Sequence, residues 1–142
     1  MLCEDGIVRP TVSGFVQAAD EAWVEVVFLL DAGADRTVFS ARFLNRLRHL
    51  EKIEAEPLRL AGVGGDVGSI TVEAVIGFQK DDGRMATVRG QFGVFTEIES
   101  ADLPVLGRDV TNNFGVIYDY PNQVVALLSW PHSYVIKTFS RA

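Results

Sequence analysis

Residue types that mark several common protein classes are scarce in this chain. Its 142 residues include one cysteine, Cys3, and two histidines, His49 and His132, which lie far apart. A single cysteine cannot form an internal disulfide, and a reducing compartment is the usual setting for such a chain. There is no Cys-X-X-Cys or His-Glu-X-X-His motif, so we expect neither a disulfide scaffold nor a metal site.

Long apolar runs and an excess of positive charge are also missing. No stretch approaches the roughly 18 consecutive apolar residues that a membrane-spanning helix needs. Glu4 and Asp5 follow Met1 closely, so the N-terminus lacks the basic start of a secretory signal. The net charge of −6 argues against nucleic acid or an anionic membrane as the main partner. We therefore expect a soluble, cytoplasmic protein that forms a single domain over residues 1–142.

Short apolar stretches separated by Gly, Asp, Asn and Pro predict a mainly β fold. Asp82-Gly83 is typical of a tight hairpin turn. Two short helices are expected: one over 41–49, capped by Ser40, and one over 108–114, ended by Gly115. The predicted strands are 7–17, 22–30, 70–76, 84–95, 103–106, 116–118 and 124–128.

One carboxylate stands at the end of a buried strand. The apolar run Val24–Leu30 leads directly into Asp31–Thr37, which reads Asp-Ala-Gly-Ala-Asp-Arg-Thr. Taken alone, an Asp-Ala-Gly sequence is most often a turn or a helix cap. Here a second apolar run, Leu103–Leu106, ends in Gly107–Asp109, which reads Gly-Arg-Asp, and a glycine-rich segment at 62–65 lies between the two. Their combination favours a catalytic acid over a turn residue.

The glycine-rich segment Gly62-Val63-Gly64-Gly65 has alternative interpretations. A phosphate-binding P-loop is excluded because no Lys-Ser/Thr follows it. A dinucleotide fingerprint requires a helix next, whereas residues 70–76 alternate like a strand. Two interpretations of this segment remain, a loose loop and a mobile hairpin tip. No Gly-X-Ser-X-Gly motif is present, so the sequence shows no serine hydrolase elbow.

Three features are considered together: the acid loop Asp31–Thr37, the glycine-rich segment at 62–65 and the Gly-Arg-Asp of Gly107–Asp109. In this order and spacing they resemble a retropepsin-like (clan AA) aspartic protease subunit of the retroviral type. The resemblance covers roughly residues 22–128. It implies a closed β-barrel of the acid-protease type with one or two short helices and a glycine-rich flap hairpin. It implies no metal and no cofactor. It also implies an ion pair between Asp35 and Arg108.

The resemblance assigns a role to each residue that matches the family motifs. Asp31 is expected to be the catalytic acid, within a loop that continues through Ala32, Gly33 and Ala34. Substrate binding is expected from Asp35, Ala61, Gly62, Val63 and Gly64, and structural support from Thr37, Gly107 and Arg108.

The chain has only one acid loop, which excludes a two-lobed, pepsin-like enzyme. Two carboxylates at hydrogen-bond distance cannot both ionise, so they share a proton, and one serves as base while the other serves as acid. A dyad in this chain therefore needs Asp31 from each of two identical subunits. The expected function is an aspartic endopeptidase that acts as a homodimer on a polypeptide substrate.

Two residues depart from the family pattern. Ala32 occupies the position where the family has Thr or Ser, whose hydroxyl reaches the partner loop, and Asp66 follows the flap glycines where an apolar residue is common. The first departure supports an alternative, namely a catalytically weak or inactive module for dimerisation or peptide binding. A further alternative is a β-barrel ligand binder of unrelated fold.

Overall fold

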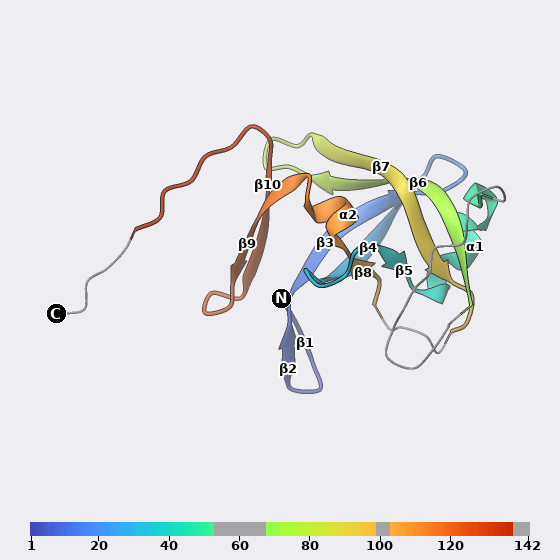
Figure 1. Ribbon diagram of the computed structural model, residues 1–142, viewed down its shortest axis with the longest axis horizontal. Helices are drawn as coiled ribbons and strands as arrows, with labels where there is room; N and C mark the ends of the chain where they lie inside the picture. Colours follow the sequence, from blue (N-terminus) through green and yellow to red (C-terminus); the bar gives the residue numbers. More distant parts are fainter. Residues whose placement is uncertain (53–67, 99–102, 138–142) are drawn as a thin grey trace.

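A computed structural model describes residues 1–52, 68–98 and 103–137 of the chain. Its central feature is a closed barrel of six strands, shown in Figure 1. In the order in which they pair around the barrel, the strands are β3 (Thr11–Gln17), β4 (Trp23–Leu30), β8 (Val105–Leu106), β5 (Val38–Phe39), β7 (Met85–Phe95) and β6 (Ser69–Gln79).

The first barrel hairpin joins β3 and β4. Their antiparallel register runs from Thr11 opposite Leu29 to Gln17 opposite Trp23. The turn between them is closed by a hydrogen bond from the Ala18 N–H to the Ala22 carbonyl, at 2.8 Å. Along β4 the side chains alternate, and Val26 and Phe28 are buried in the core. The predicted strand 22–30 is confirmed.

The second barrel hairpin joins β6 and β7, which are each 11 residues long. Val72, Ala74 and Ile76 are buried on the inner face of β6, as their alternation predicts. The turn forms at Asp82-Gly83, where Gly83 has a φ of +84° and its N–H donates to the Lys80 carbonyl at 2.9 Å. Positive φ is the backbone conformation that favours glycine.

Two further hairpins lie outside the barrel (Figure 1). One pairs β1 (Leu2–Glu4) with β2 (Ile7–Arg9), and the other pairs β9 (Phe114–Asp119) with β10 (Val124–Ser129). The predicted strand 7–17 is thus divided at Pro10 into β2 and β3. Proline has no N–H to donate, but the Pro10 carbonyl accepts a hydrogen bond from the Leu30 N–H at 2.9 Å.

The expected helix at 41–49 forms as three short turns rather than one continuous helix. A 3₁₀ turn η1 (Ala41–Phe43) is followed by α1 (Leu44–Leu47) and a second 3₁₀ turn η2 (Arg48–Leu50). Its apolar stripe does face the barrel, since Phe43, Leu44, Leu47 and Leu50 pack against the core. Ser40 occupies the N-cap position without making the cap bond, and its buried hydroxyl has no partner among the described residues. The predicted cap is therefore wrong.

The expected helix at 108–114 is shorter than predicted. It is α2 (Arg108–Thr111), and Phe114 already belongs to strand β9. Gly115 does not end a helix but pairs with Leu128 within the β9–β10 hairpin. Gly115 instead lies close to a side chain: a Cβ there would be 2.7 Å from Nε2 of His132, so that ring would have to shift.

Phenylalanine rings from several barrel strands form the centre of the core. Phe28 and Phe39 meet edge to face with centroids 5.6 Å apart, and Phe39 meets Phe92 at 6.2 Å. All three are fully buried, so the strand end that carries Asp31 rests on a packed interior. None of the helices in the described segments is long and apolar enough to cross a bilayer.

Candidate active site

The backbone of β4 is hydrogen-bonded to the β8 segment where it reaches Asp31. The Leu29 N–H donates to the Pro104 carbonyl at 2.8 Å, and the Asp31 N–H donates to the Leu106 carbonyl at 3.2 Å. These bonds continue the parallel pairing of β4 with β8. Asp31 is therefore fixed at the end of a barrel strand, as the sequence pattern predicts.

The carboxylate of Asp31 organises the loop that follows it. Oδ1 accepts a hydrogen bond from the Gly33 N–H at 2.9 Å, and the Asp31 carbonyl accepts one from the Ala34 N–H at 3.1 Å. A Cβ on Gly33 would lie 3.2 Å from the same Oδ1. Asp31 itself is exposed, so its carboxylate is accessible to a substrate or to a second carboxylate.

Thr37 is the buried anchor at the far end of the loop. Its N–H donates to both carboxylate oxygens of Asp109 at 3.0 Å, and its hydroxyl donates to Oδ1 of Asp109 at 2.7 Å. The same hydroxyl accepts a hydrogen bond from the Gly107 N–H at 2.9 Å. Thr37 thus ties the loop to the segment that leads into α2.

Two backbone hydrogen bonds bind the loop to the start of α2. The Arg108 N–H donates to the Ala34 carbonyl at 2.9 Å, and the Asp109 N–H donates to the Asp35 carbonyl at 3.3 Å. Gly107 lies so close to the loop that a Cβ there would be 2.5 Å from the Arg36 carbonyl carbon. Only glycine fits there, because the atoms that a Cβ would meet belong to the Arg36 backbone, which cannot turn aside as a side chain can.

The ion pair between Arg108 and Asp35 is present. Nη2 of Arg108 contacts Oδ1 of Asp35, and Nη1 donates to the Ala32 carbonyl at 3.3 Å. The side chains are 47% and 79% exposed, respectively, so in the single chain the pair lies at the surface. An exposed pair contributes little to stability, and its main effect is to orient the loop.

Asp109 is a site residue that the sequence analysis missed. Its position directly after Gly-Arg suggested only a helix cap or a surface acid. In the structure the Asp109 carboxylate accepts hydrogen bonds from both donors of Thr37, its N–H and its hydroxyl. The pairing of Asp109 with Thr37 spans 72 residues, so no local pattern in the sequence could have revealed it.

Ala61, Gly62, Val63 and Gly64, the expected flap, lie outside the described residues, so their role stays a prediction. The first described residue after this segment is Gly68, whose carbonyl accepts a hydrogen bond from the Thr96 N–H at 3.0 Å. Among the residues that the structure does describe, no three His, Cys, Asp or Glu side chains are grouped so as to hold a metal ion.

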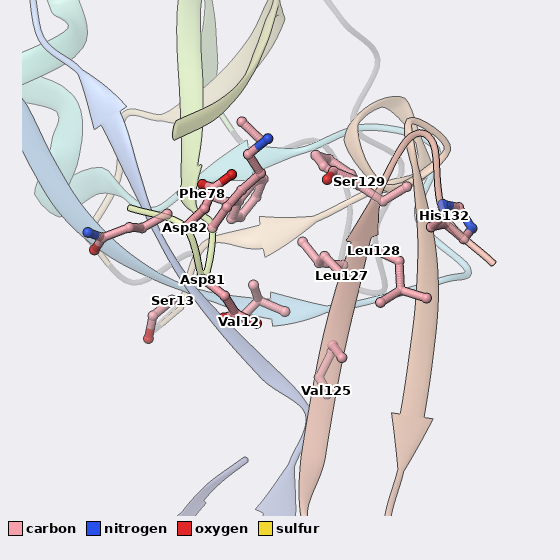
Figure 2. Close-up of a pocket in the computed structure, with 15 residues that line it drawn as sticks. Val12, Ser13, Phe78, Asp81, Asp82, Val125, Leu127, Leu128, Ser129 and His132 are labelled. Carbon is pink, nitrogen blue, oxygen red and sulfur yellow. The ribbon is translucent and has the colours of Figure 1, made fainter. Parts of the chain in front are cut away.

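A cavity of about 660 Å³ lies away from the acid loop, between β3, the β6–β7 turn and β10. Figure 2 shows Val12 from β3 and Leu127 from β10 among its lining residues, with Phe78 and Asp81 from the second barrel hairpin. Of the predicted site residues that the structure describes, Asp31 included, none lines this cavity. It is therefore separate from the candidate active site.

Comparison with solved structures identifies the architecture. The chain is similar to the EIAV protease in complex with the inhibitor HBY-793, with a TM-score of 0.50 and 26% identity over 78% of this chain and 92% of that one. It also matches the retroviral protease-like domain of Ddi1 from Leishmania major, with a TM-score of 0.49 and 15% identity over 82% and 87% of the two chains. No protein-family model and no curated protein matches the sequence.

The closed barrel agrees with the first of these similarities. The mainly β fold expected from the sequence is confirmed. The chain has a retropepsin-like fold.

Proposed function

We propose that this chain is one subunit of an aspartic endopeptidase whose catalytic dyad is formed by Asp31 from two copies. The observation that carries the proposal is the position of Asp31. It is an exposed carboxylate at the end of a barrel strand, in a loop joined to α2 by Thr37, Gly107 and Arg108. The similarity to a protease of this fold supports the same reaction class.

The chemistry follows from two carboxyl groups that share one proton. The ionised group removes a proton from a water molecule, whose oxygen attacks the carbonyl carbon of the peptide bond. The protonated group donates its proton to the carbonyl oxygen, which gives a tetrahedral diol. The diol then collapses: the carboxyl group that took the proton from water donates it to the nitrogen, the C–N bond breaks, and the other carboxylate takes a proton from one hydroxyl of the diol as the carbonyl re-forms. The amine and the carboxylic acid leave, and the dyad again holds a single proton. No covalent intermediate with the enzyme is formed.

The loop geometry suits this role. The Gly33 N–H donates to Oδ1 of Asp31 and so fixes the orientation of the carboxylate. Ala32, Gly33 and Ala34 place little side-chain bulk around the carboxylate, so a substrate backbone can approach closely. Asp35, adjacent to this loop and oriented by Arg108, is the group proposed to contact the main chain of an extended polypeptide.

The test is the substitution Asp31→Asn, measured with unfolded casein at pH 4–6 and concentrated protein. We expect cleavage to be lost while the circular dichroism spectrum and the sedimentation coefficient stay unchanged. Asp81→Asn, at an exposed acid outside the acid loop, is the matched control and should cleave at the wild-type rate. Full activity in Asp31→Asn would refute the assignment.

The rate should also depend on pH because the dyad is active only when it holds a single proton. We expect activity to fall as the second carboxyl group ionises. A rate that stays flat from about pH 4 to 9 would contradict a dyad mechanism.

A second candidate function is a dimerisation or peptide-binding module without activity. The replacement of the family's Thr or Ser by Ala32 supports it, because two copies would lose a pair of hydroxyl hydrogen bonds. Such a module would be dimeric and would bind an extended peptide, yet it would leave casein intact under every condition of the same assay.

A further inference from the structure

The cavity between β3 and β10 runs along the edges of these strands rather than across one face of a sheet. Its lining includes every residue of Val125–Ser129 on β10, and the consecutive residues Val12 and Ser13 on β3. Side chains alternate between the two faces of a strand, so a cavity on one face would touch only every second residue. The cavity of about 660 Å³ therefore lies against the backbone of both strands (Figure 2).

The edge of β10 that faces the cavity carries backbone groups without a strand partner. Within residues 1–52, 68–98 and 103–137, β10 pairs only with β9. The turn between them is closed by a hydrogen bond from the Gln123 N–H to the Tyr120 carbonyl, at 3.0 Å. From this bond the antiparallel alternation directs the N–H and carbonyl of Val125 towards β9, and those of Ala126 and Leu128 towards the cavity.

The edge of β3 across the cavity is open in the same way. The Leu30 N–H donates to the Pro10 carbonyl at 2.9 Å, so every second residue from Pro10 onwards directs its backbone groups towards β4. Ser13 therefore directs its N–H and carbonyl to the opposite side. On that side the described ladder between β3 and β6 covers only Phe15 and Val16. A chain lying between β3 and β10 would thus find backbone donors and acceptors on both sides.

His132 places an unpaired ring nitrogen at the same cavity. Its Nδ1 is buried and has no hydrogen-bond partner among the described residues, and the side chain lines the cavity. Buried polar atoms in folded proteins nearly always have a partner. A backbone N–H or carbonyl of a chain in the cavity would supply one, because a neutral imidazole nitrogen either accepts or donates a hydrogen bond.

The chain leaves this cavity as a C-terminal tail, Ser133–Lys137, with exposed apolar side chains. These residues belong to no helix or strand, and Figure 1 shows the chain running away from the barrel after β10. Tyr134, Val135 and Ile136 are 66%, 86% and 77% exposed, and residues of these types favour strands. Tyr134 stacks on His132 with ring centroids 6.4 Å apart. The tail therefore begins at the ring that lines the cavity.

We propose that the tail folds back into the cavity and adds a strand between β10 and β3. Ser133–Lys137 has as many residues as Val125–Ser129, so it matches the whole stretch of β10 that lines the cavity. The docked strand hydrogen-bonds to Ala126 and Leu128 on one side and to Ser13 on the other. It joins the β9–β10 hairpin and the barrel into one continuous sheet.

Removal of apolar side chains from water drives the docking. Val135 and Ile136 are adjacent, so in a strand they point to opposite faces, and one of them packs against Phe78 and Leu127 in the cavity. The opposing cost is the conformational entropy that the tail loses when it becomes ordered. Docking of the tail and catalysis by the acid loop are independent, because the cavity and the loop share no residue.

The first test compares amide hydrogen exchange, followed by NMR, in the wild type and in Ile136→Pro. In a strand paired on both sides every N–H is used, so proline prevents docking. The amides of Ala126 and Leu128 should then exchange at least about tenfold faster in the variant. The amides of Val125 and Leu127, which face β9, are the internal control and should change by less than about threefold. Equal exchange of Ala126 and Leu128 in the two proteins overturns the proposal.

The second test measures the melting temperatures of Val135→Asp and Ile136→Asp. At least one of them should melt about 3 °C or more below the wild type, because a charge then enters the apolar cavity. Ile98→Asp, at an isoleucine that is 87% exposed and does not line the cavity, is the matched control and should melt within about 1 °C of the wild type. If both tail variants melt like this control, the tail stays in water and the proposal is wrong.

Dependence on protein concentration identifies whose tail occupies the cavity. Docking within one chain makes the protection of Ala126 and Leu128 independent of concentration. Protection that increases with concentration would assign the cavity to the tail of a second copy and overturn docking within the chain. Casein cleavage tests the proposed function separately, so either proposal can fail while the other stands.

Discussion

The Asp109 carboxylate holds Thr37 across 72 residues of sequence. It accepts the Thr37 N–H at 3.0 Å and the Thr37 hydroxyl proton at 2.7 Å, while that hydroxyl accepts the Gly107 N–H at 2.9 Å. Thr37 is fully buried, so water has no ready access to replace its hydrogen bonds. This contact fixes the acid loop relative to α2, and with it the position of Asp31.

Replacing Thr37 with valine should destabilise the fold because it keeps the shape of the side chain but removes both hydroxyl hydrogen bonds. The Gly107 N–H is left buried without its partner, which should lower the free energy of unfolding by about 1–3 kcal/mol. Urea unfolding measures the difference. Thr37→Ser keeps the hydroxyl and loses only the methyl group, so it is the control. Equal losses in the two variants would show that the hydroxyl hydrogen bonds contribute no more than the packing of that methyl group.

Alanine should have different effects at the two glycines of the site. At Gly107 the new Cβ would lie 2.5 Å from the Arg36 carbonyl carbon, so the backbone must shift, and we expect a loss of about 1–3 kcal/mol or more. At Gly33 the Cβ would meet only Oδ1 of Asp31, at 3.2 Å, so the carboxylate turns aside while the fold is kept. Melting temperature and casein cleavage separate the two effects. A Gly107→Ala protein as stable as Gly33→Ala would contradict the close contact.

Removing the Arg108 side chain should affect cleavage far more than stability. Arg108→Leu loses the contacts with Asp35 and with the Ala32 carbonyl, but the pair is exposed, so unfolding should change by no more than about 1 kcal/mol. We expect kcat/KM to fall by about tenfold or more, because the loop loses its orientation. Arg108→Lys should recover little, since an ammonium group cannot contact both partners as the guanidinium does.

The matched control for this variant is Arg84→Leu. Arg84 pairs with Asp82 at 2.7 Å in the turn between β6 and β7, outside the acid loop. Its loss removes a comparable surface ion pair and should leave casein cleavage unchanged. Equal reductions in both variants would indicate a general effect of charge rather than orientation of the loop.

The pair between Lys52 and Glu73 should make stability depend on pH. Lys52 Nζ lies 2.6 Å from Oε2 of Glu73, and this hydrogen-bonded ammonium holds the pKa of the Glu73 carboxyl below its ordinary value of 4.5. A lowered pKa stabilises the fold above pH 4.5, and that contribution disappears as pH falls through the lowered value. The melting temperature of Glu73→Gln should therefore be below that of the wild type at pH 7 and equal to it at strongly acidic pH.

Glu25→Gln, at an exposed acid on β4, provides the comparison for this pair. Its melting temperature should equal that of the wild type at every pH. A difference between Glu73→Gln and wild type that persists unchanged into strong acid would exclude the ion pair as its cause.

Local patterns in the sequence predicted much of the barrel and the acid loop. Alternation placed Val72, Ala74 and Ile76 inside β6, and Asp82-Gly83 marked the hairpin turn, because side-chain direction and turn conformation depend on neighbouring residues. The resemblance of the acid loop to a known family supplied the expected pair of Asp35 with Arg108, which the structure contains.

Predictions of helix boundaries and of the role of Gly115 were less accurate. The segment 41–49 was expected to be one helix, yet three short turns form over residues 41–50. Packing of the apolar stripe on the barrel outweighs the weak helical preference of so short a segment. Gly115 was expected to end a helix, yet it is a strand residue whose missing side chain admits His132.

That an acid follows a buried strand can be read from the sequence, since it depends only on residues adjacent along the chain. The contact of Asp109 with Thr37, and a pocket that Ala32 shares with Val116 and Tyr118, became visible only in the folded structure. Asp109 lies 72 residues from Thr37, and the two meet because closing the barrel brings the acid loop against α2 and β9. Contacts of this kind depend on how distant segments of the chain pair, which a pattern of neighbouring residues does not specify.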